Sequence, residues 1–210
     1  MRIYLKMFDY ENKFLEKGYK LIAGMDEAGR GPLAGPVVVA CVVMPLDKEN
    51  IIDGVNDSKK LSEKKRNLLF DKIKEKAICY SISVVDHNVI DDINILQATK
   101  KGMCECVNRL SKKPDIVLVD AVSNLDVDCE MLPIIHGDAL SYSIACASII
   151  AKVTRDRMMV EFDRIYPQYN FKKHKGYGTA EHIQLLKEFG KCPIHRDTFI
   201  KNFVGSKNER

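Results

Sequence analysis

The segment LIAGMDEAGRGPLAGPVVVACVVM, residues 21–44, contains two apolar runs of strand type on either side of a glycine-rich turn. Short apolar runs bounded by glycine and proline are typical of buried strands. The pattern therefore predicts strands over residues 20–26 and 36–44. Asp26 and Glu27 stand at the end of the first run, so two adjacent carboxylates are expected where a buried strand emerges at the surface.

The turn Gly29-Arg30-Gly31 follows these acids and combines flexibility with positive charge. Glycine has no Cβ, so the backbone can approach a sugar-phosphate closely, and the arginine fork matches phosphate oxygens. Together with the two carboxylates, the turn suggests a metal ion beside a phosphate. The same residue types also form ordinary solvated turns, so the local pattern alone leaves both interpretations open.

The composition is that of a soluble globular protein. The chain has 210 residues, of which 46% are hydrophobic and 30% charged, enough for one domain with a small appendage. It lacks an apolar stretch of membrane-spanning length and a signal-like N-terminus, which predicts a cytoplasmic protein without membrane contact. Its seven cysteines never occur as Cys-x-x-Cys, which argues against a disulfide framework or a zinc site.

The charge is unevenly distributed along the chain. Residues 57–76 hold eight cations and four anions, and residues 172–210 hold nine and four. These two excesses exceed the net charge of +4, so the remainder is net acidic. This segregation suggests a basic surface around an acidic centre, as expected for a protein that holds a polyanion. A solvated helical face would also explain a basic segment of mixed lysine and glutamate.

Further along the chain, apolar spacing and capping residues predict a mixed sheet covered by helices. The expected helices cover residues 4–17, 62 onward, 96–111, 140–165 and 179–189, and the further strands cover residues 79–86, 116–120 and 132–135. Residues 172–178 read as a basic loop, and a polar tail follows the last helix. We therefore expect an α/β domain over residues 1–168, with residues 1–19 as its leading helix, and a small helical appendage over residues 169–210.

Four acids are candidates for catalysis: Asp26, Glu27, Asp120 and Asp138. Two separate strands carry acids at their C-terminal ends, and neighbouring strands would bring them together. Clustered carboxylates repel one another unless a cation neutralises them. Oxygen ligands without cysteine or histidine favour Mg²⁺ or Mn²⁺, and two such ions can cleave a phosphodiester without a covalent intermediate. Such acids also serve as turn formers or helix caps, Asp138 above all.

Six segments, in the same order, resemble the bacterial ribonuclease HII family across nearly the whole chain. They are GMDEAGRGPLAGP (24–36), NDSKKLS (56–62), LVDAV (118–122), HGDALSYSIACASIIAKVTRDR (136–157), HKGYGT (174–179) and PIHRDTF (193–199). The resemblance implies an RNase H-like fold with a C-terminal helical region that helps to bind substrate.

The family's activity would be that of an endonuclease. The resemblance implies cleavage of the RNA strand of RNA/DNA hybrids and nicking on the 5′ side of single ribonucleotides in duplex DNA, leaving a 3′-hydroxyl and a 5′-phosphate. Such an enzyme would serve DNA replication and ribonucleotide excision repair. The four acids would bind Mg²⁺ or Mn²⁺, with two ions present when substrate is bound. We expect a monomer without an evident protein partner.

The resemblance also assigns substrate contacts. Gly29, Arg30 and Gly31 would contact the ribose 2′-hydroxyl and flanking phosphates, and Tyr177 would pack on the sugar beyond the ribonucleotide. A contact to the 2′-hydroxyl is what distinguishes RNA from DNA at one position. The expected backbone contacts come from the side chains of Ser58, Lys59, Lys152 and Arg155.

Alternatives remain for several of these assignments. Tyr177 could be a core or loop-anchoring aromatic, and Lys152 and Arg155 could pair with Asp156 or cover a helix surface. His136 stands where the family often has lysine, which puts one electrostatic contact near Asp138 in question. At the level of function, the rivals are a resolvase-like DNA nuclease of the same superfamily and a hybrid-binding module without catalysis.

Overall fold

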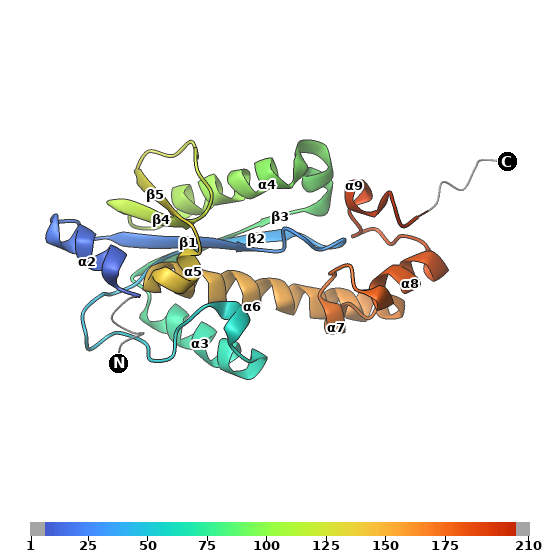
Figure 1. The fold of residues 1–210 in the computed structure, drawn as a ribbon, viewed down its shortest axis with the longest axis horizontal. Coiled ribbons are helices and arrows are strands. Elements are labelled where there is room, and N and C mark those ends of the chain that lie inside the picture. The colour runs from blue at the N-terminus through green and yellow to red at the C-terminus, as the bar shows by residue number, and fades with distance from the viewer. Residues whose placement is uncertain (1–6, 205–210) are drawn as a thin grey trace.

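The computed structural model describes residues 7–204, which form a five-stranded mixed sheet with helices on both faces (Figure 1). Its strand order is β3-β2-β1-β4-β5. The strands are β1 (Ile22–Ala28), β2 (Val37–Val43), β3 (Cys79–Val85), β4 (Ile116–Asp120) and β5 (Glu130–Ile134). The central strand β1 runs antiparallel to β2 and parallel to β4. The predicted α/β fold with a mixed sheet flanked by helices is confirmed.

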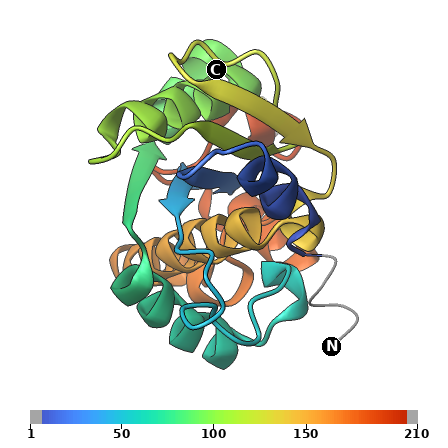
Figure 2. The same cartoon turned by 90° about the vertical axis from the view of Figure 1, so that its left-hand side faces the viewer.

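The helices divide between the two faces of the sheet and its ends (Figures 1 and 2). They are α2 (Asp9–Glu16), α3 (Glu63–Lys76), α4 (His87–Arg109), α5 (Gly137–Leu140), α6 (Tyr142–Ile165), α7 (Phe171–His174), α8 (Ala180–Phe189) and α9 (Asp197–Ile200), with 3₁₀ turns η1 (Ser58–Lys60) and η2 (Pro167–Tyr169). Alternating residues of β2 separate the two layers. Val39 and Cys41 pack towards α4, whereas Ala40 and Val42 pack towards α3 and α6.

The long helix α6 lies directly on β1, and this contact sets the geometry of the protein. Its first half is rich in small residues, as the sequence suggested, and is almost wholly buried. A Cβ added to Gly24 of β1 would lie 2.0 Å from the carbonyl carbon of Ser143 at the start of α6. Only a glycine allows the helix backbone to approach the strand this closely.

The strand register explains why acids from distant parts of the chain meet. Met25 of β1 is paired with Val119 of the parallel strand β4. The next residues, Asp26 and Asp120, therefore stand side by side on these two interior strands, where β4 ends beside α5. Because β1 continues to Ala28, Asp26 and Glu27 lie within the strand and not beyond it.

The helix expected over residues 140–165 is wrong at its start. Ser141 has an extended backbone, with φ −128° and ψ 128°, and separates α5 from α6. Its hydroxyl accepts the N–H of Ile144 and donates to the buried carboxylate of Glu11 at 2.6 Å. This tertiary contact with α2, which periodicity cannot reveal, ends one helix and begins the next.

Other boundaries also differ from those expected. Helix α4 begins at His87, well before residue 96, because Asp86 caps it and the chain passes through a left-handed kink at Asn94. The basic loop contains α7, and the polar tail contains α9; both helices are four residues long and too short to show a period. The leading helix is confirmed as α2, while residues 4–6 of its expected range lie outside the described residues.

The C-terminal region packs on the far end of α6 (Figure 1). Tyr169 and Phe171 share an apolar cluster with Ala34 and Met159, and Leu186 and Ile200 share another with Leu33. The turn that follows β1 thus forms part of the same apolar clusters as the C-terminal helices. The domain boundary at residue 168 stays a prediction.

Candidate active site

Three aspartates from three separate elements converge at one end of the sheet. Asp26 of β1, Asp120 of β4 and Asp138 of α5 each offer a ligand oxygen, and these oxygens lie within 4.8 Å of one another. Asp26 and Asp138 are buried and Asp120 is partly exposed. Three of the four acids singled out in the sequence therefore form one oxygen-lined centre.

Each aspartate is oriented by a neighbouring group. Asp120 Oδ1 accepts the backbone N–H of Gly137 at 2.8 Å, which ties β4 to α5. Asp138 Oδ2 lies 3.2 Å from Lys59 Nζ, and no side-chain cap is present on α5. The alternative that Asp138 serves as a helix cap is therefore excluded. Asp26 accepts hydrogen bonds from the Glu27 N–H and from Ser148.

Glu27 borders this group of three aspartates. Its Oε1 lies 3.4 Å from Arg30 Nη1, whereas its Oε2 is buried and has no hydrogen-bond partner among the described residues. Burial raises the pKa of Glu27, the Arg30 charge lowers it, and the negative charge of Asp120 raises it further. A buried carboxylate oxygen without a donor is costly, so it is available for a cation.

Without a cation, the carboxylates of the acidic centre repel one another. Burial raises the pKa of Asp26 well above its usual range, with the charges of Glu27 and Asp120 adding to the effect. Burial also raises the pKa of Asp120, although the N–H of Gly137 opposes it. A divalent cation would remove this repulsion, and a set of donors made only of carboxylate oxygens suits a hard ion. The residues present therefore fit a metal site.

Two buried arginines hold the turn that follows β1. Arg196 donates to the carbonyls of Gly29 at 2.6 Å, Arg30 at 3.0 Å and Gly35 at 2.9 Å. Gly29 has φ +103°, and a Cβ there would lie 2.1 Å from Arg155 Nε. The glycines thus allow the turn to adopt a backbone conformation that other residues rarely adopt, and Arg155 and Arg196 hold the turn in it.

The predicted substrate contact by Arg155 conflicts with its position. Its side chain is 0% exposed and donates to the carbonyls of Pro36, Lys175 and Ala34. The arginine supports the backbone behind the turn and does not face solvent. Arg196 has the corresponding role. Sequence reasoning noted its motif, PIHRDTF, but missed this role, because a sequence does not distinguish a buried arginine from an exposed one.

The other predicted contacts lie around the acidic centre. Lys59 is exposed beside Asp138, and Ser58 is buried with its hydroxyl 2.9 Å from that of Ser148. Lys152 pairs with Asp156 at 2.7 Å, as one alternative proposed. The exposed His136 begins α5 in a left-handed conformation with φ 58°, and its charge lowers the pKa of Asp120.

Tyr177 is a surface residue and not part of the core. Tyr177 is 43% exposed, and the centre of its ring lies 5.8 Å from Lys152 Nζ. On the other side, a Cβ built on Gly31 would meet only Tyr177 Cε1, at 3.9 Å. The structure therefore brings the glycine turn and the tyrosine together across a small open space.

A chain of buried histidines holds the backbone of Tyr177. His182 Nδ1 lies 2.9 Å from the Tyr177 carbonyl, His182 Nε2 lies 3.0 Å from His195 Nε2, and His195 Nδ1 accepts the N–H of Cys192 at 2.9 Å. A carbonyl only accepts, so His182 carries its hydrogen on Nδ1 and His195 carries its own on Nε2. Burial lowers the pKa of both rings to about 4, so both are neutral at pH 7.

Comparison with known proteins identifies the family. The sequence profile described as Ribonuclease HII matches residues 23–202. The chain belongs to the ribonuclease HII family. It is 56% identical over 199 residues to Ribonuclease HII of Ruminiclostridium cellulolyticum, an alignment that covers 95% of this chain and 77% of that protein. The resemblance noted in the sequence is confirmed.

Solved structures agree with this assignment. The ribonuclease H2 of Pyrococcus horikoshii superposes with a TM-score of 0.72 at 30% identity, covering 85% of this chain and 93% of that one. The ribonuclease HII in a PCNA complex from Archaeoglobus fulgidus gives a TM-score of 0.73 at 26% identity, with coverages of 89% and 98%. The chain is thus a ribonuclease H, an endonuclease acting on RNA/DNA hybrids. Within residues 7–204, no helix is long and apolar enough to cross a membrane.

Proposed function

We propose that this ribonuclease HII nicks duplex DNA on the 5′ side of a single embedded ribonucleotide, besides cleaving the RNA strand of hybrids. The products would carry a 3′-hydroxyl and a 5′-phosphate. The observation that supports the proposal is the convergence of the carboxylates of Asp26, Asp120 and Asp138 beside a rigid glycine turn. An enzyme with this site would act in DNA replication and ribonucleotide excision repair, in the cytoplasm.

Asp26, Glu27, Asp120 and Asp138 would hold Mg²⁺ or Mn²⁺, two ions when substrate is bound. When bound, the ions would supply an activated water and stabilise the leaving oxygen. The protein's own part is to fix the carboxylates before substrate arrives, through Gly137, Ser148 and Lys59. Pre-formed carboxylates need no reorganisation when the phosphate binds.

The glycine turn offers two backbone donors for a hydroxyl or a phosphate. The carbonyls of Gly29 and Arg30 point inward to Arg196. In a trans peptide the N–H of the next residue points opposite to the carbonyl, and no cis bond occurs among the described residues. The N–H groups of Arg30 and Gly31 therefore point away from Arg196, where an incoming 2′-hydroxyl oxygen could accept from them.

The open space between Gly31 and Tyr177 supports the same interpretation. Gly31 does not have a left-handed backbone, and no atom lies within 3.9 Å of a Cβ built there. The fold itself therefore does not require glycine at this position, whereas close approach of a ribose would. Tyr177 would then pack on the neighbouring sugar, and Ser58, Lys59 and Lys152 would contact the phosphate backbone.

The deciding experiment is cleavage of a labelled duplex that contains one ribonucleotide. We expect a single nick on its 5′ side that depends on Mg²⁺ or Mn²⁺ and disappears with chelator. The matched control is the same duplex made wholly of DNA. Equal cutting of both would favour the resolvase-like rival, and binding without metal-dependent cutting would favour a hybrid-binding module. A uniform hybrid in parallel would establish which substrate is preferred.

Arg30→Ala tests the side chain of the turn, because alanine keeps the backbone N–H of residue 30 and removes the guanidinium beside Glu27. We expect it to reduce the ratio of cleavage at ribose to cleavage at deoxyribose by about tenfold to a hundredfold, since the charged hydrogen bond that would hold the flanking phosphate, and with it the ribose, against the turn contributes roughly 1.5–3 kcal/mol. Duplex affinity should change less. The measurement is kcat/KM on the single-ribonucleotide duplex together with Kd for the all-DNA duplex.

Lys172→Met is the comparison variant for Arg30→Ala. Lys172 belongs to the basic segment, is exposed, and bonds Asp163 and Lys175 through its backbone. Its loss should weaken binding to all duplexes and reduce the salt dependence of log Kd by about one. If Arg30→Ala behaves like Lys172→Met, with affinity lost and discrimination kept, the assigned role of Arg30 is wrong.

A further inference from the structure

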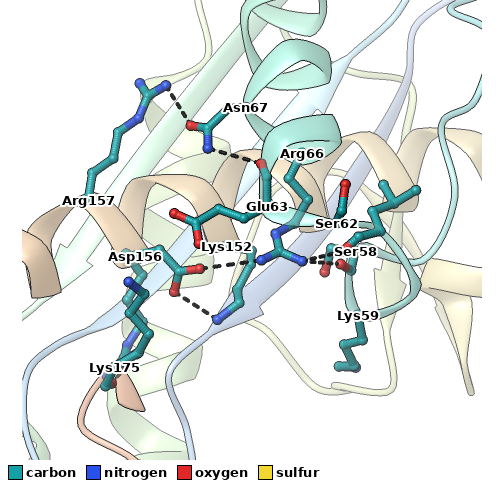
Figure 3. A network of polar contacts seen from close by, with 12 residues as sticks. Ser58, Lys59, Ser62, Glu63, Arg66, Asn67, Lys152, Asp156, Arg157 and Lys175 are labelled. Carbon is teal, nitrogen blue, oxygen red and sulfur yellow. Dashed lines mark hydrogen bonds and ion pairs between the residues drawn. The ribbon is translucent and has the colours of Figure 1, made fainter. Parts of the chain in front are cut away.

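A partly buried arginine on α3, Arg66, reaches back to the segment that precedes its own helix (Figure 3). Arg66 Nη1 donates to the carbonyl of Ser58 at 3.1 Å and to the carbonyl of Leu61 at 2.5 Å. Its side chain is only 14% exposed. We propose that Arg66 is a positioning residue that holds residues 57–61 over the acidic centre; the inference rests on the proposed substrate contacts of Ser58 and Lys59.

Residues 57–61, here the 57–61 segment, touch the acidic centre at two points. Lys59 Nζ lies 3.2 Å from Asp138 Oδ2. Ser58 Oγ lies 2.9 Å from Ser148 Oγ, and Ser148 in turn hydrogen-bonds Asp26. A shift of this segment would therefore move a lysine and a hydroxyl that face two of the metal-site carboxylates.

The 57–61 segment has little structure of its own to keep it in place. It is one 3₁₀ turn of three residues, closed by the Lys60 N–H on the Asp57 carbonyl and by a long bond of 3.4 Å from Leu61 N to Ser58 O. These bonds shape the turn, but they do not attach it to the domain. Leu61 and Ser58 attach it through the apolar core and through Ser148. Arg66 adds the link to the backbone, because one guanidinium nitrogen bridges the carbonyls at both ends of the turn.

The same guanidinium connects the segment to a second predicted contact. Arg66 Nη2 lies 3.9 Å from Asp156 Oδ2, and Asp156 Oδ1 pairs with Lys152 Nζ at 2.7 Å. Figure 3 shows these contacts spanning from α3 across to α6. Arg66 and Asp156 therefore link two cationic residues, Lys59 and Lys152, that are both proposed to contact the phosphate backbone.

Two substitutions test this role. Arg66→Lys keeps the charge and most of the stem, but its single ammonium cannot hold the Ser58 and Leu61 carbonyls and also face Asp156, as the two guanidinium nitrogens do. Arg66→Met removes the donors. Misplacement of about 1 Å can cost on the order of a hundredfold in rate. We expect kcat/KM on the single-ribonucleotide duplex to fall about tenfold for Arg66→Lys and up to about a hundredfold for Arg66→Met.

Arg157→Met is the matched control. Arg157 joins the same two helices, through a 3.0 Å bond to Asn67 Oδ1 and a guanidinium 4.4 Å from the centre of the Phe70 ring. It has no contact with the 57–61 segment or with Asp156 among the interactions of the described residues. Its loss should lower the melting temperature at least as much as Arg66→Lys does, while kcat/KM stays at the wild-type value.

A double-mutant cycle with Lys59→Met separates positioning from mere stabilisation. If Arg66 acts through the 57–61 segment, Arg66→Met combined with Lys59→Met should lose little more kcat/KM than the larger single loss. Losses that multiply would overturn the proposal. So would wild-type kcat/KM in Arg66→Lys, or losses that only follow the unfolded fraction. Failure of the wild-type protein to nick the duplex would instead refute the proposed function.

Discussion

Asp120→Asn is expected to abolish metal-dependent cleavage while the protein stays folded. Asparagine keeps an oxygen that can accept the Gly137 N–H, so the link from β4 to α5 survives. The substitution removes one negative ligand from the three converging carboxylates. A bound metal contributes several kcal/mol to the transition state, and about 1.4 kcal/mol is tenfold in rate. We therefore expect a loss of roughly a thousandfold or more in kcat.

A second measurement examines the metal site without relying on activity. The carboxylates repel one another, since burial and neighbouring charge raise the pKa of Asp120. In chelator the melting temperature of Asp120→Asn should equal or exceed that of the wild type, and the rise on adding Mn²⁺ should be smaller. Asp126→Asn, at an exposed position in the connection from β4 to β5, is the control. Wild-type activity in Asp120→Asn would show that the site lies elsewhere.

Gly24→Ala is expected to destabilise the protein strongly, although it adds only one methyl group. The added Cβ would lie 2.0 Å from Ser143 C, 2.1 Å from Ser143 O and 2.3 Å from Ile144 N. All three are backbone atoms, so α6 itself must move away from β1. Overpacking of a well-packed core costs up to about 3 kcal/mol and occasionally more, which for a chain of this size lowers the melting temperature by roughly 6–12 °C.

Activity should fall further than the loss of stability explains. Asp138 lies just before α6, so displacement of the helix start separates it from Asp26 on β1. Gly31→Ala is the stability control, because its Cβ meets nothing nearer than 3.9 Å and its backbone is not left-handed. We expect its melting temperature to stay within about 1 °C of the wild type. A fully stable Gly24→Ala protein would show that α6 does not lie as close to β1 as described.

The sequence was most informative where the pattern of apolar residues predicted a strand and the residue at the end of that strand was a potential metal ligand. The run Ile116–Asp120 is β-branched and ends in an acid, so both strand β4 and its candidate ligand could be predicted. The pairing of β4 with β1 could not be derived from that pattern, because parallel register depends on contacts across many residues. The acids at two strand ends suggested that Asp26 and Asp120 meet, and the strand register establishes that they do.

The residues that sequence reasoning missed or placed wrongly share a different property. Arg66 and Arg196 were missed, and Arg155 was predicted as a substrate contact. All three are charged, yet each is largely or wholly buried and bonded to backbone carbonyls. Charge suggests a surface position, and carbonyl partners leave no trace in a sequence. The role of Gly24 is also invisible in the sequence, because it depends on the absence of a side chain where α6 packs on β1. Ser141 resembled a helix residue because its partner, Glu11, is distant in the chain.

The histidine chain behind Tyr177 makes the aromatic contact sensitive to acid independently of the carboxylates. Each neutral ring donates one hydrogen bond and accepts one. A second proton on His182 would sit on Nε2 and face the Nε2–H of His195, so two donors would oppose each other. The ordinary pKa of 6.5 applies in the unfolded chain, whereas both rings fall to about 4 when folded. Their neutral forms therefore contribute folding free energy fully above pH 6.5, and that contribution is lost as the pH falls through 4. The hydrogen bond to the Tyr177 carbonyl thus depends on two histidine side chains, His182 and His195, keeping their hydrogens on Nδ1 and Nε2 respectively.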